Sequence, residues 1–396
     1  MPRDAAQTCR SDIGPGFRAL RIRTLTLKNF RNFADLSVRF SDRRNVILGA
    51  NAEGKTNILD AVHMLGVGRS HRERRDSNLV KFGEDYYRIE GVFDHIGVKT
   101  TIEVAYSVEG KRIRINGKNA RTSDLVGLAA VVITSPDDID LIKGGPQLRR
   151  RFLDIAICQT SREYLATLQQ YVRALAQRNV LLKDARDGGE KPDTGVWDKA
   201  LIEAGSRVVA MRYGFLDFLS PMVQEGFSLI CGAETGTALT YEPRGYSPEA
   251  GRAPEAEPVP QADVIAAALR EALERNRDGE VGRGYTMVGP HVDDFMFLAD
   301  GRDLRTFGSE GEQRTAVLSL RCAEASAIKQ RLDKSPIVLL DDIFAELDDA
   351  RGAALISLIS RFDQIVLTSS RQSPLGAEKV HRISVKDARV TYDGEA

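Results

Sequence analysis

The segment from Gly49 to Asn57 has the residue types and spacing of a triphosphate-binding loop. It follows the pattern G-x-x-x-x-G-K-T plus one residue, and its members are Gly49, Ala50, Asn51, Ala52, Glu53, Gly54, Lys55, Thr56 and Asn57. An apolar run before the loop predicts a buried strand, and the periodicity of positions 58–65 predicts a helix. In that context backbone N–H groups and the positive helix end face the phosphates. Lys55 can pair with phosphate oxygens and the Thr56 hydroxyl can bind Mg²⁺, which favours ATP binding over a chance glycine-rich turn.

Two carboxylates follow another buried strand near the end of the sequence. The run from Ser335 to Leu340 is almost wholly apolar, and Asp341 and Asp342 come directly after it. Ligands of open α/β sheets bind at the carboxyl ends of the strands, so we expect both acids beside the phosphate loop. Asp341 would bind Mg²⁺ directly or through water, and Asp342 would activate the attacking water. The alternative is that the pair caps the next helix. The upstream loop favours a catalytic role, with Lys55 as the third catalytic residue.

A short polar segment with the pattern S-x-G-E-Q begins a predicted helix shortly before the acidic strand. Its members are Ser309, Gly311, Glu312 and Gln313. A helix N-terminus can bind an anion, but helix caps that contain serine and glycine are common. The position of the segment, far after the phosphate loop and just before the acidic strand, is therefore more informative than the pattern alone.

The rest of the sequence defines the elements that must position these residues. Strands are expected within 19–48, 91–106 and 111–115, near Tyr285, and from Asp294 to Leu298. Helices are expected within 149–232, including one over 197–218 that Pro221 interrupts or follows, and over 263–275. The stretch 232–260 is rich in Gly, Pro and Glu and is expected to contain a flexible loop. The fold class is α/β.

Composition limits the possible functions. The 56 basic and 56 acidic residues give a formal net charge of zero, so nucleic-acid binding would depend on local basic patches. The four cysteines have no metal-site spacing. No apolar run has the length of a membrane span and no apolar signal segment follows Met1, so we expect a cytoplasmic protein with no membrane contact. Residues 1–18 are expected to form a flexible extension.

The order of phosphate loop, S-x-G-E-Q segment and acidic strand resembles the ABC ATPase class, in its chromosome-maintenance branch. Several longer segments resemble the RecF family of bacterial recombination mediators. These segments are Leu27–Phe33, Gly66–Arg72, Arg149–Asp154, Gly289–Asp294 and Leu339–Asp348. They extend from about residue 20 to 370, and the long coiled coil of related SMC-type ATPases is missing from this sequence.

This resemblance implies an ABC-type P-loop ATPase core, with a mixed or parallel sheet, and an inserted, mainly helical lobe. The core would comprise 19–148 and 331–396, and the helical lobe would comprise 149–330, ending in the signature segment. Arg31 and Asn32 would join the ATP site. Two subunits would pair head to tail in the presence of ATP, so that each signature segment caps the γ-phosphate bound by the other subunit.

The resemblance also implies an ATP-dependent DNA-binding protein of recombinational repair and replication, with ATP and Mg²⁺ as cofactors. It would act on single-strand gaps and duplex DNA, help load RecA with RecR, RecO or both as partners, and support the SOS response. We expect a weak, DNA-stimulated ATPase that works as a switch. The alternatives are a transporter ATPase subunit and an ATP-binding adaptor that acts only through protein partners.

Three positions depart from common patterns of the class. Ala52 stands where many relatives have glycine, and alanine is expected there only with a negative φ. The segment from Thr368 to Ser370 replaces the histidine that transporter ATPases place against the γ-phosphate. Asp342 replaces a longer glutamate. A neutral hydroxyl and a shorter acid predict slow hydrolysis.

Basic side chains that could contact DNA phosphates occur in three clusters. The first is a predicted hairpin that contains Lys111, Arg112, Arg114 and Lys118. The second surrounds Arg72 and includes Arg69, Arg74 and Arg75, and the third is Arg149–Arg151. Each cluster could instead be solvated surface, and Arg149 could form an internal ion pair. His291 could bind a metal, but packing is the favoured interpretation.

Overall fold

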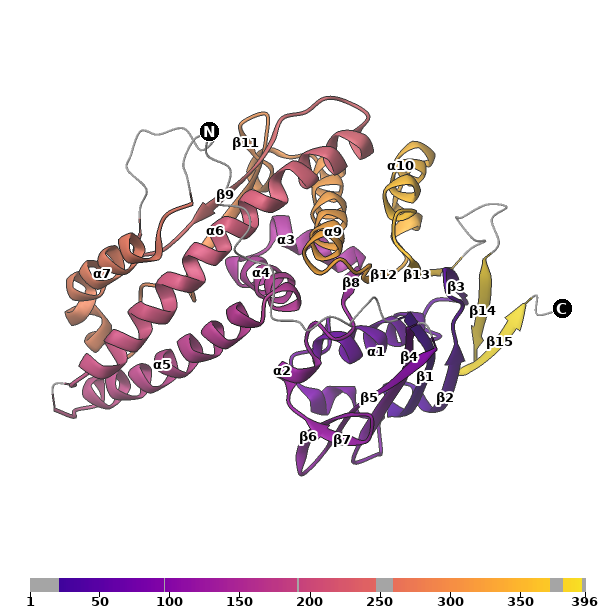
Figure 1. The fold of residues 1–396 in the computed structure, drawn as a ribbon, viewed down its shortest axis with the longest axis horizontal. Helices are drawn as coiled ribbons and strands as arrows, with labels where there is room; N and C mark the ends of the chain where they lie inside the picture. Colours follow the sequence, from indigo (N-terminus) through magenta and orange to yellow (C-terminus); the bar gives the residue numbers. More distant parts are fainter. Residues whose placement is uncertain (1–20, 96, 191, 247–258, 371–379, 394–396) are drawn as a thin grey trace.

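The computed structural model describes residues 21–95, 97–190, 192–246, 259–370 and 380–393, so the predicted extension at 1–18 lies outside the described residues. Two parts are visible in Figure 1. A compact α/β part carries α1 and most strands, and a helical arm is formed by α5, α6 and α7. We name the α/β part lobe I and the helical part, with α3 to α9, lobe II. None of the described helices combines the length and apolar character needed to cross a membrane.

The central sheet of lobe I is mixed, as predicted, and has the order β15-β14-β3-β13-β12-β8. Its strands are β3 (Arg44–Leu48), β8 (Val131–Thr134), β12 (Ile337–Leu340), β13 (Gln364–Ser369), β14 (His381–Lys386) and β15 (Arg389–Asp393). Only β15 is antiparallel to its neighbour. Every residue of β12 and β13 is buried, as the apolar runs predict for central parallel strands. In the register of the sheet, the ends of β3, β13 and β12 lie side by side.

A second sheet, wholly antiparallel, covers the other side of α1 (Lys55–Val67). It comprises β1 (Arg21–Phe30), β2 (Phe33–Arg39), β4 (Tyr87–His95), β5 (Val98–Ser107), β6 (Gly110–Ile115) and β7 (Lys118–Ala120). The predicted strand region 91–106 is thus two strands of a hairpin. Apolar residues of α1, such as Ile58 and Leu65, share one core with side chains of both sheets. Because nearly all of α1 is buried, its position is fixed by packing on both sides. The short elements η1 (Asp76–Leu79) and α2 (Thr122–Leu125) complete this region.

Lobe II is mainly helical. Its helices are α3 (Asp140–Lys143), α4 (Pro146–Thr160), α5 (Arg162–Arg186), α6 (Gly195–Cys231), α7 (Ala262–Arg283), α8 (Leu304–Phe307) and α9 (Glu310–Leu332). A small sheet, β11-β10-β9, covers part of it, with β9 (Thr237–Glu242), β10 (Asp294–Ala299) and β11 (Arg302–Asp303). The predicted boundaries at 149 and 331 fall inside α4 and α9. The segments η2 (Pro136–Ile139), η3 (Ile343–Glu346) and α10 (Asp349–Ile359) lie next to the ends of sheet strands.

Two local predictions for lobe II were wrong. Helix α6 continues through Pro221, because the buried side chains of Leu219 and Val223 on either side outweigh the local cost of a proline. The stretch 232–260, which was expected to contain a flexible loop, includes β9, which pairs with β10, and its residues 247–258 lie outside the described residues. Tyr285 lies in the connection after α7 rather than in a strand, and its side chain is half exposed.

Helix α9 belongs to both lobes. Leu320 and Ala327 lie in the apolar core of lobe II, whereas Leu318 and Ile328 pack with the central sheet and α10. The helix therefore carries the predicted signature segment at its start and also packs against the central sheet (Figure 1). The longest described helix, α6, packs into the lobe core, and none of the described helices projects as a long coiled coil.

Candidate nucleotide site

The phosphate loop lies between the end of β3 and the start of α1, as predicted. Gly54 caps α1 with a left-handed φ of 98°, which favours glycine. A Cβ at Gly49 would lie 2.5 Å from the carbonyl oxygen of Val385 on the neighbouring strand β14. Both glycines are therefore required by the close packing of the loop.

The expectation for Ala52 was wrong. Its φ is 69°, in the left-handed region rather than the negative region. This conformation costs an alanine roughly 1–2 kcal/mol relative to the right-handed region, a cost that glycine avoids. Ala52 is exposed, so its side chain meets no steric obstacle and the strain is purely in the backbone. The phosphate loop thus has a strained residue at its centre.

The Lys55 ammonium lies inside the loop. Its Nζ donates hydrogen bonds to the carbonyl oxygens of Gly49 at 2.8 Å and Ala50 at 2.9 Å, and its side chain is almost fully buried. These contacts hold the charge at the concave side of the loop, where backbone N–H groups of a phosphate loop converge.

Of the two acids that follow β12, Asp341 contacts the phosphate-loop helix and Asp342 contacts the end of β13. The Thr56 hydroxyl donates to Oδ1 of Asp341 at 3.0 Å, and the Thr368 hydroxyl at the end of β13 donates to the same oxygen at 2.8 Å. The backbone N–H of Asp342 donates to Thr368 Oγ1 at 2.9 Å. Burial raises the pKa of Asp341, although the hydrogen bonds from Thr368 and Thr56 oppose that change.

This arrangement fits Mg²⁺. The donors are a carboxylate and a hydroxyl, the oxygen ligands that Mg²⁺ prefers, and the ion usually takes its remaining ligands from phosphates and water. Thr56 and Asp341, predicted as the metal ligands, lie within hydrogen-bond distance of each other. Thr368 was considered only as a replacement for a histidine. Its role in orienting Asp341 and Asp342 could have been found from its place at the end of a buried strand.

Arg31 and Asn32 have different surroundings. Asn32 donates from Nδ2 to the Glu53 carbonyl oxygen at 3.1 Å and accepts from Asn57 Nδ2 at 2.8 Å, so it supports the phosphate loop from the β1–β2 turn. Arg31 instead donates to the Asn78 carbonyl oxygen at 3.2 Å and pairs with Glu73 at 3.5 Å. Only Asn32 of this pair touches the loop.

The signature segment begins α9. Ser309 is exposed and caps the helix, and its Oγ and backbone N donate to Oε2 of Glu312 at 2.7 and 2.8 Å. These bonds lower the pKa of Glu312. Gly311 packs against the Arg351 guanidinium of α10. Gln313 is buried and donates to the Leu304 carbonyl oxygen at 2.8 Å, so its side chain belongs to the interior of lobe II.

Comparison with known proteins defines the family. A family model described as RecF/RecN/SMC N terminal domain matches residues 21–391. The DNA replication and repair protein RecF of Halalkalibacterium halodurans is 37% identical over 357 residues, which cover 89% of this chain and 93% of the relative. That of Moorella thermoacetica is 37% identical over 365 residues, covering 92% and 94%. The chain belongs to the RecF family.

Solved structures agree with this assignment. A structure described as the recombination mediator protein RecF-ATP in the RecFOR pathway superposes with a TM-score of 0.86 at 30% identity, covering 96% of this chain and 99% of that one. The Smc head bound to the C-winged helix domain of ScpA gives a TM-score of 0.52 at 18% identity and covers 94% and 96%. The Smc likeness concerns the fold alone. The family model, which groups RecF with RecN and SMC proteins, agrees with the SMC-like branch predicted from the motif order.

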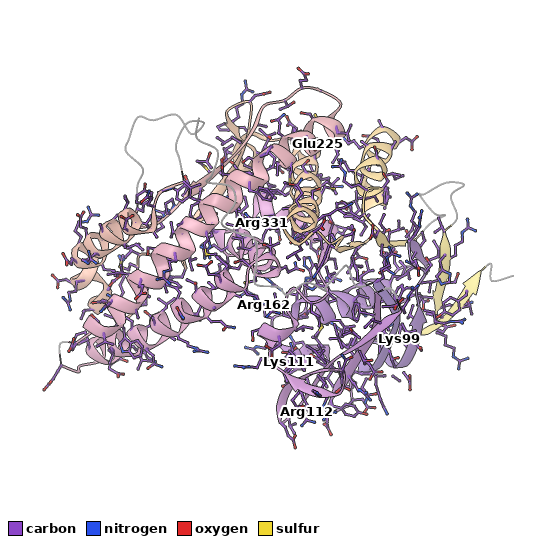
Figure 2. All side chains as sticks on the ribbon, viewed as in Figure 1. Lys99, Lys111, Arg112, Arg162, Glu225 and Arg331 are labelled. Carbon is purple, nitrogen blue, oxygen red and sulfur yellow. The ribbon has the colours of Figure 1, made fainter. Side chains whose placement is uncertain are left out.

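The predicted hairpin cluster is largely ion-paired. Lys111 contacts Asp76 at 2.9 Å, and the partners of Arg112 and Arg114 are Glu109 at 3.4 Å and Glu103 at 3.7 Å. Figure 2 shows Lys111 and Arg112 at the β5–β6 end of the antiparallel sheet. Lys118 is exposed on β7, and Arg72 pairs with Asp137 at 3.3 Å.

Two of the segments that resemble the RecF family form a buried charge network in lobe II. Arg149 of α4 donates to both carboxylate oxygens of Asp294, at 2.6 and 2.8 Å, which confirms the predicted internal ion pair. Arg212 of α6 donates to Asp154 at 2.8 Å and to the Pro290 carbonyl oxygen at 2.7 Å. Burial opposes the charge of Arg212, but its acidic neighbours raise its pKa well above the usual value. These segments therefore stabilise lobe II, a role that the sequence did not indicate for Arg212.

His291 is a packing residue. Its Nδ1 lies 2.6 Å from the Tyr171 hydroxyl and its Nε2 lies 3.0 Å from the Thr286 carbonyl oxygen. Across the described parts of the chain, no group of three or more His, Cys, Asp or Glu side chains could hold a metal. The two contacts of its ring nitrogens confirm the favoured interpretation of His291 as a packing residue.

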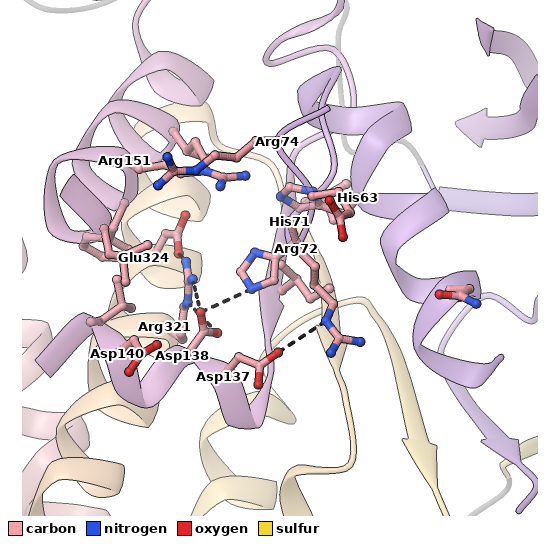
Figure 3. A pocket seen from close by; sticks show the side chains of 18 of the residues that line it. His63, His71, Arg72, Arg74, Asp137, Asp138, Asp140, Arg151, Arg321 and Glu324 are labelled. Carbon is pink, nitrogen blue, oxygen red and sulfur yellow. Dashed lines mark hydrogen bonds and ion pairs between the residues drawn. The ribbon is translucent and has the colours of Figure 1, made fainter. Parts of the chain in front are cut away.

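A cavity of about 610 Å³ separates the two lobes beside the phosphate-loop helix. Figure 3 shows the charged network on its wall. Asp138 of η2 accepts from Arg321 of α9 at 2.7 and 3.2 Å and lies 3.3 Å from His71 Nε2. Arg321 also donates to Glu324 at 2.9 Å. The His71 backbone N–H donates to Asp60 of α1 at 2.7 Å, so α1 and α9 are connected through a chain of polar contacts.

Proposed function

We propose that this protein is an ATP-dependent DNA-binding switch of recombinational repair and replication. The observation that carries the proposal is the contact of Thr56 and Thr368 with the same oxygen of Asp341 beside the phosphate loop. Three strand ends thereby supply the groups that a Mg²⁺–ATP site needs. The names of the curated relatives, and the solved RecF–ATP structure, support ATP binding and a role in DNA repair.

The residues of the loop have separate roles in this proposal. Backbone N–H groups of 49–56 bind the phosphates, and Lys55 exchanges its two carbonyl partners for phosphate oxygens. Mg²⁺, when bound, neutralises charge that develops on the phosphates. Thr368 holds Asp341 in position, and the partly exposed Asp342 orients the water. No positive charge comes from Thr368 or Ser369, which is why we propose a weak ATPase. We also propose that DNA stimulates this activity.

Dimer formation would complete the site. Ser309 is exposed at the start of α9, and the neighbouring Phe307 is 72% exposed. An exposed aromatic side chain beside a helix N-terminus is suited to an interface. We propose that ATP drives head-to-tail pairing in which Ser309 and Gly311 face the partner's nucleotide. Glu312 would hold Ser309, and Gln313 would hold α9 against Leu304.

The cellular partners follow from the family. We propose that RecR, RecO or both bind this protein at single-strand gaps, that RecA loading follows, and that the SOS response depends on it. Residues 19–148 and 331–396 would act as the ATPase lobe, and 149–330 as the helical lobe. The similarity to RecF proteins disfavours a transporter subunit. The ion pairs of the hairpin cluster keep the adaptor function as the alternative outcome of the test.

The test is a titration of labelled gapped duplex with the full chain, with and without ATP, at low and high salt. A DNA-binding switch binds more tightly with ATP and loses affinity as salt rises, because phosphate contacts release counterions. An adaptor binds ATP normally but shows no ATP-enhanced, salt-sensitive DNA binding. That second result would contradict the proposal.

A further inference from the structure

Two arginines from distant segments of the sequence line the cavity between the lobes, and a third arginine lies next to one of them. Arg69 and Arg74 follow α1 in lobe I, and Arg151 lies on α4 of lobe II. Arg74 and Arg151 line the cavity, and Figure 3 shows their guanidinium groups close together across it. Arg151 donates to the Ser70 carbonyl oxygen at 2.6 Å, which brings it next to Arg69. We name these three residues the interlobe arginine cluster.

The carboxylates around the cavity already have cationic partners. The pairs are Asp138 with Arg321 and His71, Glu324 with Arg321, Asp137 with Arg72, and Glu73 with Arg31. In Figure 3, Asp140 lies below Arg74 and Arg151, with Glu324 and Arg321 between them. Both carboxylate oxygens of Asp60 accept hydrogen bonds, from the Ser70 hydroxyl at 2.6 Å and the His71 backbone N–H at 2.7 Å.

The cluster itself has neutral partners. Arg151 bonds to a backbone carbonyl, and Arg74 donates to Oε1 of Gln147 at 3.4 Å. Among the described residues, no ion pair is found for Arg69, Arg74 or Arg151. Burial, followed by the charges of Arg69 and Arg74, lowers the pKa of Arg151. Like charges held together in this way are stabilised by an anion that enters between them.

A phosphate group matches this cluster in charge and geometry. The planar guanidinium presents paired N–H donors that fit two phosphate oxygens at once. Arg69 and Arg74 are exposed and Arg151 is half-buried, so a ligand can approach from solvent. The hairpin cluster is less suited to bind phosphate, because Lys111, Arg112 and Arg114 already contact carboxylates.

We propose that the interlobe arginine cluster binds phosphate groups of the DNA backbone and so connects DNA to both lobes. This inference rests on the DNA binding proposed above and names its site. Lobe I carries the phosphate loop and lobe II carries the signature segment. DNA bound at the cluster therefore contacts both lobes that form the nucleotide site. The contact reads charge and shape rather than base sequence.

The test compares the salt dependence of duplex binding by the ATP-bound full chain for wild type and Arg74→Gln/Arg151→Gln. Loss of about one phosphate contact lowers the slope of log K against log salt by roughly 0.9, so the double variant should lose roughly 1.8. Arg74→Gln alone, which breaks only the 3.4 Å contact with Gln147, should lose about half of that and guards against misfolding of the double variant. Arg74→Lys/Arg151→Lys keeps the charges and should retain most of the slope.

Two control variants complete the design. Arg207→Gln on α6 removes an exposed arginine that pairs with Glu203 at 3.2 Å, and it should leave the slope unchanged. Arg112→Gln tests the rival hairpin cluster and should have little effect. Inorganic phosphate is titrated alone by calorimetry to separate DNA from a free ion as the ligand.

The possible results distinguish this inference from the proposed function. If wild type binds DNA with ATP and the double variant has the same affinity and slope, the cluster is not the DNA site, although the proposed function stands. A large loss for Arg112→Gln with none for Arg74→Gln also overturns the inference. Inorganic phosphate that binds at the cluster without any change in DNA binding in the variants would make it an ion site and reject the DNA role. If wild type does not bind DNA, both proposals fail.

Discussion

Removal of the charge of Asp138 tests how the two lobes are joined. Asp138 is only 6% exposed, and its carboxylate accepts two hydrogen bonds from Arg321, at 2.7 and 3.2 Å. Asp138→Asn keeps the shape but leaves the buried guanidinium of Arg321 with one carboxylate, that of Glu324, whose own pKa is raised by burial. Breaking a buried ion pair costs roughly 3–5 kcal/mol. Because Glu324 remains, we expect a loss near the lower end, about 3 kcal/mol.

The neighbouring residue provides a matched control. Asp137 lies on the same short helix, pairs with Arg72 at 3.3 Å, and its side chain is 65% exposed. Exposed pairs contribute roughly 0.2–1 kcal/mol, so Asp137→Asn should have little effect. Both variants are unfolded in urea, and the free energies of unfolding are compared at neutral pH. Equal free energies of unfolding for the two variants would refute the reasoning. They would mean that the buried contacts of Asp138 stabilise the fold no more than the exposed contact of Asp137.

The difference in free energy of unfolding between wild type and Asp138→Asn should change with pH in a definite direction. Burial raises the pKa of Asp138, but the charges of Arg321 and His71 outweigh it, so the pKa lies below the ordinary value. A carboxylate with a lowered pKa stabilises the fold above its unfolded pKa of about 3.9 and loses that contribution as the pH falls through its folded pKa. The gap between wild type and Asp138→Asn should therefore be constant near neutral pH and shrink below about pH 4.

Three further substitutions test the nucleotide site. Lys55→Met should weaken ATP binding about a hundredfold or more in calorimetry, since charge-assisted hydrogen bonds contribute roughly 1.5–3 kcal/mol each; normal affinity would contradict the placement of Lys55. Ser309→Arg should leave ATP binding by the monomer intact but block the ATP-induced dimer in light scattering, and a normal dimer would count against capping in trans. Asp342→Asn should slow hydrolysis by about a hundredfold and prolong the dimer, because a positioned base contributes roughly 10²–10⁴; an unchanged rate would assign the water to another residue.

Local patterns predicted most of the nucleotide site. The phosphate loop, the strand that ends just before Asp341 and the helix that begins after Ser309 are each encoded by a short run of residues. The left-handed φ of Ala52 was not predictable, because the packing of the whole loop selects it against the preference of alanine. Likewise α6 continues through Pro221 because its own Leu219 and Val223 are buried against other elements in the core of lobe II.

Long-range charge pairing was the least predictable part of the structure. Arg74 and Arg151 stood in separate basic clusters of the sequence, and only the packing of α4 against the loop after α1 brings them together. Arg212 gave no signal at all, because its partners come from four different elements or loops. A single sequence contains no information on which of many acids a given arginine will meet.

The position of Asp138 explains why the lobes are joined by charge as well as by apolar contact. Apolar packing of α9 on the central sheet is non-directional and tolerates small rotations. The Asp138 carboxylate accepts from Arg321 on one side and faces His71 on the other, and those distances are met in few relative positions of α9 and α1. Strand β8 leads into η2, which carries Asp138, and β8 pairs with β12 in register up to Leu340. Asp138 and Asp341 therefore follow neighbouring strands of the same sheet. Asp138 thus links α9, which begins after Ser309, to α1, which carries Thr56. Asp138→Asn should weaken the packing of these two helices relative to each other before it destabilises either helix alone.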